Sequence, residues 1–412
     1  MATTRVTRAT RATRLRSGTA LLGPAFVAAI AYVDPGNVAT NTAAGARYGF
    51  LLVWVLVAAN VMAGLVQTLS AKLGLVTGRS LPEAVRDGLS RPARLAYWAQ
   101  AEGVAVATDL AEVVGGAIAL NLLFDLPLLL GGVITGGVST VLLVLRDRSG
   151  QRAFERVITG MLLVIAIGFA AGLLLSPPPA EALGGLAPRF DGVDSVVLAA
   201  GMLGATVMPH AVYVHSALAR DRHGQATGDA LRRLLAATRV DVVLAMVVAG
   251  AVNLALLLLA ATALRDVPGL DGLDQVHAAI GDALGGGVAL LFAVGLLASG
   301  LASTAVGSYS GAVVLEGLLD VRVSLLTRRL VTLAPALLVL AVGADPTRAL
   351  VWSQVVLSFG IPFALVPLVR LTSSRAVMGE HVNGRGTVVA AWGAAGAVIA
   401  LNAVLLVLLA IG

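Results

Sequence analysis

The stretch Asp34-Pro35-Gly36-Asn37 decides the fold, because it sets an acid, a helix breaker and an amide inside an apolar segment. Residues 19–33, directly before it, carry no charged side chain. A carboxylate at bilayer depth costs roughly 2.5–3.5 kcal/mol, so it is seldom kept there without a function. Pro35 lacks an N–H group and Gly36 is permissive, so the helix should unwind here and free carbonyl groups that a cation can satisfy. The alternative is that Asp34 begins an aqueous loop after a complete span.

Composition is typical of a polytopic membrane protein. Hydrophobic residues make up 58% of the 412 residues, charged residues make up 13%, and the mean hydropathy is +0.91. These values lie far from those of a soluble domain. Cysteine is absent, which excludes disulfides and thiolate metal sites. The arginine-rich residues 1–18 are interpreted as a basic cytoplasmic tail rather than a cleaved targeting segment.

Apolar runs of about 20 residues, the length that crosses a bilayer, predict eleven transmembrane helices. The predicted spans are 19–41, 49–76, 95–124, 127–145, 157–176, 193–219, 236–264, 286–315, 328–344, 347–369 and 386–411.

The distribution of basic residues predicts the orientation. With the N-terminus inside, all but four of the 29 basic residues fall in cytoplasmic segments, the exceptions being Arg47, Arg189, Arg265 and Arg348. Such a bias predicts a multi-pass protein of the cell membrane with a cytoplasmic N-terminus and an extracytoplasmic C-terminus. It also argues against a nucleic-acid partner, which the isoelectric point near 10.4 would otherwise suggest.

Two prolines divide the spans into equivalent units. Pro209 interrupts the sixth span as Pro35 interrupts the first. Because each unit contains an odd number of spans, the second is inserted upside down relative to the first, as in many secondary transporters. The predicted parts are a tail at 1–18, a first unit at 19–176 (spans 1–5), an extracytoplasmic linker at 177–192, a second unit at 193–371 (spans 6–10) and an additional span at 386–411.

The break in the sixth span contains a candidate soft metal ligand. Residues 205–210 read ATVMPH, so Met208 directly precedes the breaking proline. A methionine in a span usually serves packing, but this one lies beside a break that pairs with Asp34. Carboxylate, amide and carbonyl oxygens with one thioether favour manganese or iron over magnesium or calcium. His210 is a candidate proton carrier, although a lone histidine is more often a packed side chain.

Three acids lie in the third span. Glu102, Asp109 and Glu112 are spaced seven and three residues apart, which puts them on one helical face. A stripe of acids through an apolar span is typical of a proton relay or an ion path. The alternative is structural pairing with arginines of another helix, for which Arg328 and Arg329 at the start of the ninth span are candidates.

Four motifs in this order resemble the Nramp family of proton-coupled divalent-metal transporters. They are residues 34–37 (DPGN), residues 107–113 (ATDLAEV), residues 205–210 (ATVMPH) and the segment 295–311 with its serines, threonine and glycines. The resemblance extends from about residue 19 to residue 370. It implies an all-α integral membrane protein with a LeuT-like inverted repeat, in which helices 1 and 6 are discontinuous.

The resemblance also implies functional residues. The implied metal ligands are Asp34, Asn37, Met208, the carbonyl groups of Ala31 and Ala205, and in some states Gln354. The implied proton route runs from Asp34 past His210 to Glu112, Asp109 and Glu102, with Arg328 and Arg329 beyond.

The chain departs from the family pattern at a few positions. Ala211 stands where an asparagine is common, Leu301 stands where a glutamine is usual, and Gly360 is small for its place in the tenth span. These positions lie beside the implied site, so they bear on rate and metal preference.

The sequence therefore predicts a proton-coupled symporter, not an enzyme, that imports Mn²⁺ or Fe²⁺ into the cytoplasm by alternating access. Its expected substrates are metal ions and protons, and it is expected to reside in the lipid bilayer. No resident cofactor, nucleic acid or obligatory protein partner is expected. One rival is a sodium-coupled amino-acid symporter of the same fold, which needs a free helix N-terminus for a substrate carboxylate. Another is a membrane enzyme or receptor with a structural metal, which needs an aqueous domain or a closed ligand set.

Overall fold

The computed structural model describes residues 23–224, 226–265, 267, 270, 272–321 and 323–411. The predicted tail at 1–18, the first residues of the predicted first span and Arg322 lie outside the described residues. The regular structure of the described part consists of helices.

The first predicted unit contains one broken helix and four long helices. The broken helix consists of α2 (Pro24–Ala29), the 3₁₀ helix η1 (Ile30–Val33) and α3 (Pro35–Tyr48). The long helices are α4 (Val53–Thr77), α6 (Arg91–Phe124), α7 (Leu128–Ser149) and α8 (Gln151–Leu175). The short helix α5 (Leu81–Arg86) joins α4 to α6, and η2 (Ala180–Leu186) lies in the predicted linker.

The second predicted unit repeats this pattern. Its broken helix consists of α9 (Gly192–Thr206) and α10 (Pro209–His223). Its other long helices are α11 (Gly228–Ala263), α13 (Gly286–Leu319), α14 (Leu325–Ala341) and α15 (Pro346–Thr372). The remaining elements are α12 (Leu273–Leu284), α16 (Arg375–Met378), η3 (Gly379–His381) and α17 (Arg385–Ile411).

Nine helices of the described chain are long and apolar enough to cross a membrane, with α9 and α10 taken together. The other two predicted spans correspond to the broken helix from α2 to α3 and to α14, which has 17 residues. The count of eleven transmembrane helices therefore stays a prediction. Several helices extend beyond their predicted bounds, since α6 and α13 each have 34 residues and α11 has 36.

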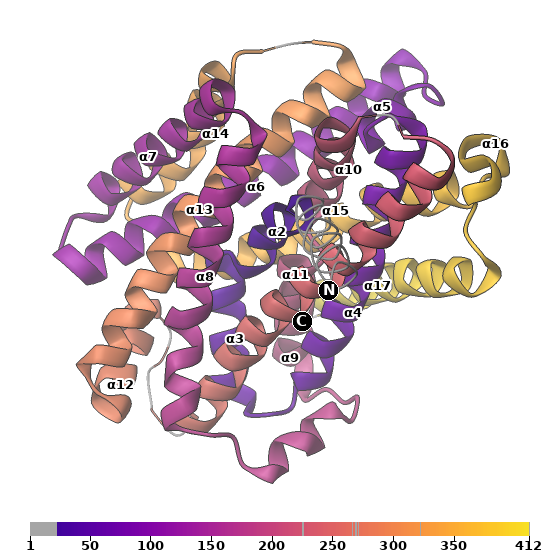
Figure 1. Ribbon diagram of the computed structural model, residues 1–412. Coiled ribbons are helices and arrows are strands. Elements are labelled where there is room, and N and C mark those ends of the chain that lie inside the picture. The colour runs from indigo at the N-terminus through magenta and orange to yellow at the C-terminus, as the bar shows by residue number, and fades with distance from the viewer. Residues whose placement is uncertain are drawn as a thin grey trace, which may run out of the picture.

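The two units pack into each other rather than side by side. Helix α13 lies against α6 and α8, α3 lies against α11, and α15 lies against α6. Glycines allow the closest approach: a Cβ on Gly300 of α13 would lie 2.9 Å from the backbone nitrogen of Gly116 in α6. Small residues at helix contacts are the usual means of close packing in membranes. Figure 1 shows α2 near the middle of the molecule, with α7 and α14 at one edge and α17 at the opposite edge.

Candidate functional site

The first break lies between η1 and α3. Asp34 has extended backbone angles (φ −71°, ψ 168°) and caps α3, whose first residue is Pro35. Its Oδ1 accepts hydrogen bonds from the backbone N–H of Asn37 at 2.7 Å and from Asn37 Nδ2 at 2.8 Å. A proline at the first helical position and an aspartate cap are the usual start of a helix. Asp34 is fully buried, so the alternative that it begins an aqueous loop is wrong.

The second break lies between α9 and α10. Val207 (φ −107°, ψ 61°) and Met208 (φ −68°, ψ 124°) leave the helical conformation, and Pro209 begins α10. The missing N–H group of Pro209 explains why the helix ends here and restarts. Met208 is completely buried. Both breaks predicted from the sequence are therefore present.

Asn37 connects the two breaks. Its Nδ2 carries two hydrogens and donates to Asp34 Oδ1 at 2.8 Å and to the carbonyl oxygen of Ala205 at 2.9 Å. Its Oδ1 accepts a longer hydrogen bond of 3.5 Å from Thr206 Oγ1. The remaining carboxylate oxygen, Asp34 Oδ2, is buried and has no hydrogen-bond partner in the described part of the chain. An unpaired buried carboxylate oxygen is costly and marks a place where a cation or a proton is stabilised.

Gln354 of α15 lies over the first break. A Cβ added to Gly36 would come within 1.9 Å of Gln354 Nε2, so only glycine allows this side chain to cross the helix start. Gln354 is fully buried, and its Oε1 accepts no hydrogen bond from the described residues. Gln354 therefore brings a free amide oxygen to the region of Asp34 and Asn37.

Two polar side chains to which the sequence analysis gave no role donate hydrogen bonds to carbonyl groups of the first break. Asn253 Nδ2 of α11 donates to the Tyr32 carbonyl at 2.6 Å, and Ser299 Oγ of α13 donates to the Val33 carbonyl at 2.6 Å. The carbonyl of Ala31, one residue earlier in η1, receives no such side-chain donor from the described residues. The available signals were the lone amide of Asn253 in a long apolar run and the place of Ser299 within the motif at 295–311.

Two of the three acids in α6 are paired with arginines of α14. Arg329 Nη1 lies 2.5 Å from Asp109 Oδ1, and Arg328 Nη1 lies 3.0 Å from Glu102 Oε2. The pairing alternative is thus correct for these two acids. Glu112 differs, because both of its carboxylate oxygens are buried and accept no hydrogen bond from the described residues.

His210 lies between the second break and α6. Its Nδ1 is 3.4 Å from Thr108 Oγ1, the residue before Asp109, and its Nε2 is buried without a partner in the described part of the protein. Its carbonyl oxygen accepts a hydrogen bond of 2.6 Å from Ser310 Oγ of α13. The imidazole is therefore held on one side and unpaired on the other.

Gly360 is small because three helices converge on it. A Cβ at this position would lie 2.5 Å from Val104 Cγ2 of α6 and 3.2 Å from Pro209 Cγ at the second break. The departure from the family pattern therefore lets α15 pack closely against α6 and α10.

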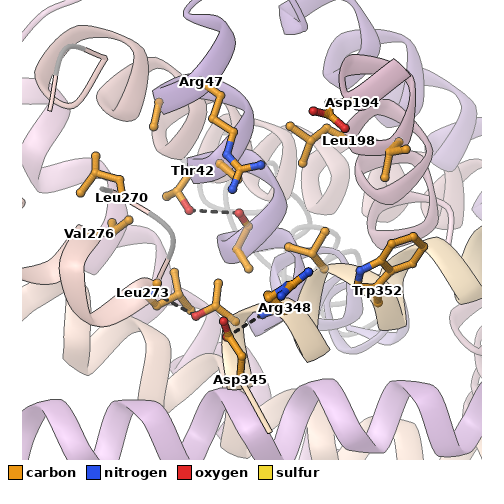
Figure 2. Close-up of a pocket in the computed structure, with 17 residues that line it drawn as sticks. Thr42, Arg47, Asp194, Leu198, Leu270, Leu273, Val276, Asp345, Arg348 and Trp352 are labelled. Carbon is orange, nitrogen blue, oxygen red and sulfur yellow. Dashed lines mark hydrogen bonds between the residues drawn. The ribbon is translucent and has the colours of Figure 1, made fainter. Parts of the chain in front are cut away.

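A cavity of about 490 Å³ lies next to these residues and is lined by α3, α9, α12 and α15 (Figure 2). Its wall includes Ala39, two residues after Asn37, and Val351, three residues before Gln354. Charged side chains of both signs also line it, namely Arg47, Arg348, Asp194 and Asp345. The cavity therefore approaches the two breaks from the end of the molecule where α3 finishes and α9 and α15 begin.

No group of three or more His, Asp or Glu side chains that could hold a metal ion occurs among the described residues. A closed metal site of that kind, which is one of the two features expected of the enzyme or receptor rival, is thus absent from this part of the chain. The ligand set implied by the resemblance draws instead on one carboxylate, amide and carbonyl oxygens, and a thioether.

Comparisons with known proteins identify the family of this chain. The family model described as "Natural resistance-associated macrophage protein-like" (Nramp) matches residues 25–408. A protein of Mycobacterium tuberculosis, named divalent metal cation transporter MntH, is 62% identical over 402 residues, which cover 97% of this chain and 94% of that protein. The protein of the same name from Bacillus subtilis is 46% identical over 390 residues, covering 94% and 91% of the two chains.

Solved structures match as well. The crystal structure of a manganese transporter from Eremococcus coleocola has a TM-score of 0.85 and 32% identity, and the match covers 94% of this chain and 86% of that one. Mhp1, a nucleobase-cation-symport-1 family transporter, has a TM-score of 0.58 at 17% identity, covering 94% and 92% of the chains, which shows the fold alone. The fold is the predicted LeuT-like one. The chain belongs to the Nramp family.

Proposed function

We propose that this chain is a proton-coupled symporter that carries divalent transition-metal ions, Mn²⁺ or Fe²⁺, into the cytoplasm by alternating access. Metal transport is supported by the curated relatives, which are named divalent metal cation transporters, and by the solved relative named a manganese transporter. The choice of metal, the coupling to protons and the direction of transport are argued from this chain's own residues.

The observation that carries the proposal is the Asp34 carboxylate. It is fully buried at a helix break, and its Oδ2 has no hydrogen-bond partner in the described part of the chain. The Asn37 hydrogen bond to the Ala205 carbonyl joins this break to the one that contains Met208. Discontinuous helices that meet in this way form the substrate sites of transporters with inverted repeats.

Ligand chemistry supports a transition metal. We assign the metal ligands as Asp34, Asn37, Met208 and the carbonyls of Ala31 and Ala205, with Gln354 approaching in some states. Oxygen donors accept most divalent ions, whereas the thioether of a buried methionine binds Mn²⁺ or Fe²⁺ better than Ca²⁺ or Mg²⁺. The Met208 sulfur is therefore the reason to expect discrimination against Ca²⁺ and Mg²⁺.

Unpaired polar atoms support a proton route. His210 Nε2 and both oxygens of Glu112 are buried without partners in the described part of the chain, which are atoms that can take up or release protons. We propose that protons leave Asp34 past His210 to Glu112 and then pass along Asp109 and Glu102. Arg329 and Arg328, which pair with these last two acids, would stabilise their charged forms.

The direction of transport follows from the proposed orientation. If the N-terminus is cytoplasmic, as the arginine distribution predicts, the cavity between α3, α9, α12 and α15 faces the outside. That cavity would admit metal ions to the two breaks, and rearrangement of the broken helices would release them on the other side.

Uptake by proteoliposomes tests the proposal. Purified protein is reconstituted, and uptake of Mn²⁺, Fe²⁺, Cd²⁺, Mg²⁺ and Ca²⁺ is measured with and without an inward proton gradient. We expect Mn²⁺ and Fe²⁺ uptake to rise with the gradient and Asp34→Asn to abolish it. Asp125→Asn is the matched control, because Asp125 is an exposed carboxylate at the end of α6. Uptake that is unchanged in Asp34→Asn would refute the assigned site.

A further inference from the structure

A groove on the lipid-facing side of the protein lies between α4, α11 and the start of α17. It has a volume of about 600 Å³ and is separate from the two helix breaks. Its apolar part includes Val61 of α4 and Val243 and Val247 of α11, which are 68%, 59% and 61% exposed. Because these valines belong to membrane-spanning helices, their exposed surface faces hydrocarbon.

Two cations line one end of this groove. Lys72 of α4 and Arg239 of α11 are close enough for their like charges to repel, and neither forms an ion pair with a carboxylate of the described residues. Lys72 Nζ donates to Asn383 Oδ1 at 2.7 Å. Asn383 is fixed in turn by Thr372, which accepts from its backbone N–H at 3.1 Å and from its Nδ2 at 2.9 Å. An ammonium group has three donors, so Lys72 retains two for a ligand.

The start of α17 adds further donors to the same end. Gly384 and Thr387 line the groove, and the first hydrogen bond of the helix runs from Val388 N to the Gly384 carbonyl. The N–H groups before Val388 therefore have no partner within the helix, and a helix N-terminus attracts anions. The described residues that line the groove include no carboxylate.

The charged and apolar parts are arranged along the membrane normal. Val61 precedes Lys72 by eleven residues, about 16 Å along α4. Val247 follows Arg239 by eight residues, about 12 Å along α11. Asn60 Nδ2 donates to the Met246 carbonyl at 3.2 Å, whereas Lys72, later in α4, lies near Arg239, earlier in α11. The two helices therefore run antiparallel, and both apolar parts extend in the same direction from the cations.

We propose that this groove binds an anionic phospholipid. Its phosphate lies between Lys72, Arg239 and the first turn of α17, and one acyl chain follows the apolar part past Val243 to Val61 and Val247. Basic pockets between transmembrane helices are a known physical basis for binding acidic lipid head groups. Two neighbouring cations without carboxylate partners among the described residues fit one phosphate. A groove that continues into hydrocarbon fits a lipid better than a soluble anion.

Gly64 keeps the apolar part open. A Cβ at this position would meet only Met246 Cγ, at 3.7 Å, so a larger side chain would project into the groove rather than into a packed core. Gly64→Leu is therefore a variant that should fill the acyl-chain groove. Gly160→Leu is its matched control, since Gly160 of α8 is exposed and a Cβ there meets nothing within 4 Å.

The experiment counts bound lipid on the intact protein by native mass spectrometry after titration of phosphatidylglycerol in detergent. Phosphatidylcholine and soluble glycerol phosphate are the comparison ligands, and thermal unfolding verifies that each variant is folded. We expect one phosphatidylglycerol to bind with a preference over phosphatidylcholine. Lys72→Gln and Arg239→Gln should each weaken it about fivefold, and Gly64→Leu should remove it. Arg233→Gln, an exposed arginine on the same helix outside the groove, should leave it unchanged.

Three results would overturn the proposal. Equal binding of phosphatidylcholine would show that the cations do not select the head group. Equal weakening by Arg233→Gln would show a diffuse attraction to positive charge. Full competition by glycerol phosphate would show a site for a soluble anion. If Gly64→Leu does not fold, the two cation variants and the Arg233 control still decide between these results.

Discussion

The paired Asp109 and the unpaired Glu112 predict losses of stability of very different size for two similar substitutions in α6. Asp109→Asn removes one partner of an ion pair of 2.5 Å whose side chains are 3% and 1% exposed, and it leaves the buried Arg329 guanidinium with a longer hydrogen bond of 3.4 Å to Ser308 Oγ in place of the ion pair. Breaking a buried pair in this way costs about 3–5 kcal/mol. Glu112→Gln keeps the shape and removes no hydrogen bond of the described residues, so its cost should stay within about 1 kcal/mol.

A double-mutant cycle measures this difference. The free energy of unfolding in detergent is compared for wild type, Asp109→Asn, Arg329→Met and the double variant. Removing both partners removes both charges of this pair, so the double variant should be more stable than Asp109→Asn alone. The reasoning is refuted if Asp109→Asn is as stable as wild type, because the pair would then contribute nothing to the fold.

Proton transfer is measured on the same variants. Metal-driven acidification of proteoliposomes should weaken in both Glu112→Gln and Asp109→Asn, while metal binding is largely retained, since neither residue is an assigned ligand. Glu112→Gln is the more informative, because its fold should be intact. Acidification that persists unchanged in both single variants and in the double variant would exclude a relay along this face and leave a purely structural role for the acids.

Three further substitutions test the site itself. Gly36→Ala should abolish metal binding, measured by calorimetry, and with it transport, because its Cβ would lie 1.9 Å from Gln354 Nε2. Adding Gln354→Ala to the same chain should restore part of the metal binding. If binding is not restored, another contact is responsible for the loss. Gly307→Ala should slow metal-driven acidification without a large loss of stability, because its Cβ would lie 2.8 Å from Glu112 Oε2 and would displace a flexible carboxylate. Unchanged acidification would contradict this prediction. Met208→Ala should let Ca²⁺ and Mg²⁺ compete with radiolabelled Mn²⁺ uptake, since the thioether no longer fills the coordination sphere; competition equal to wild type would make Met208 a packing residue.

The helix breaks could be predicted from the sequence because their cause is local. Pro35 and Pro209 lack an N–H group wherever they stand, and an acid such as Asp34 within an apolar run requires a partner or a function. The nine helices of the described chain that are long and apolar enough to cross a membrane could be predicted from length and composition for the same reason. These properties need no knowledge of which helices are neighbours.

The pairing of the acids could not be predicted, because it depends on tertiary contact. The spacing of Glu102, Asp109 and Glu112 gives a common helical face, but it does not say which helix covers each residue. In the structure, arginines of α14 pair with Glu102 and Asp109, whereas Gly307 of α13 faces Glu112. The crossing of Gln354 over Gly36 is likewise a contact between helices more than 300 residues apart in the chain.

In the proposed site, the polar contacts of Asn37 link metal binding to helix position. Asn37 Nδ2 donates to Asp34 Oδ1 and to the Ala205 carbonyl, which is one of the proposed metal ligands, whereas Asp34 Oδ2 has no partner in the described part of the chain. A cation bound by Asp34 Oδ2 and the Ala205 carbonyl would place positive charge beside the Nδ2 hydrogens, so the Asn37 amide would have to turn before its own oxygen could serve as a ligand. In the proposed site, the metal would then replace the hydrogen-bonded bridge between the two breaks with an electrostatic one. Binding would therefore change what joins α3 to α9, and the broken helices would be the elements through which metal occupancy alters the conformation of the transporter.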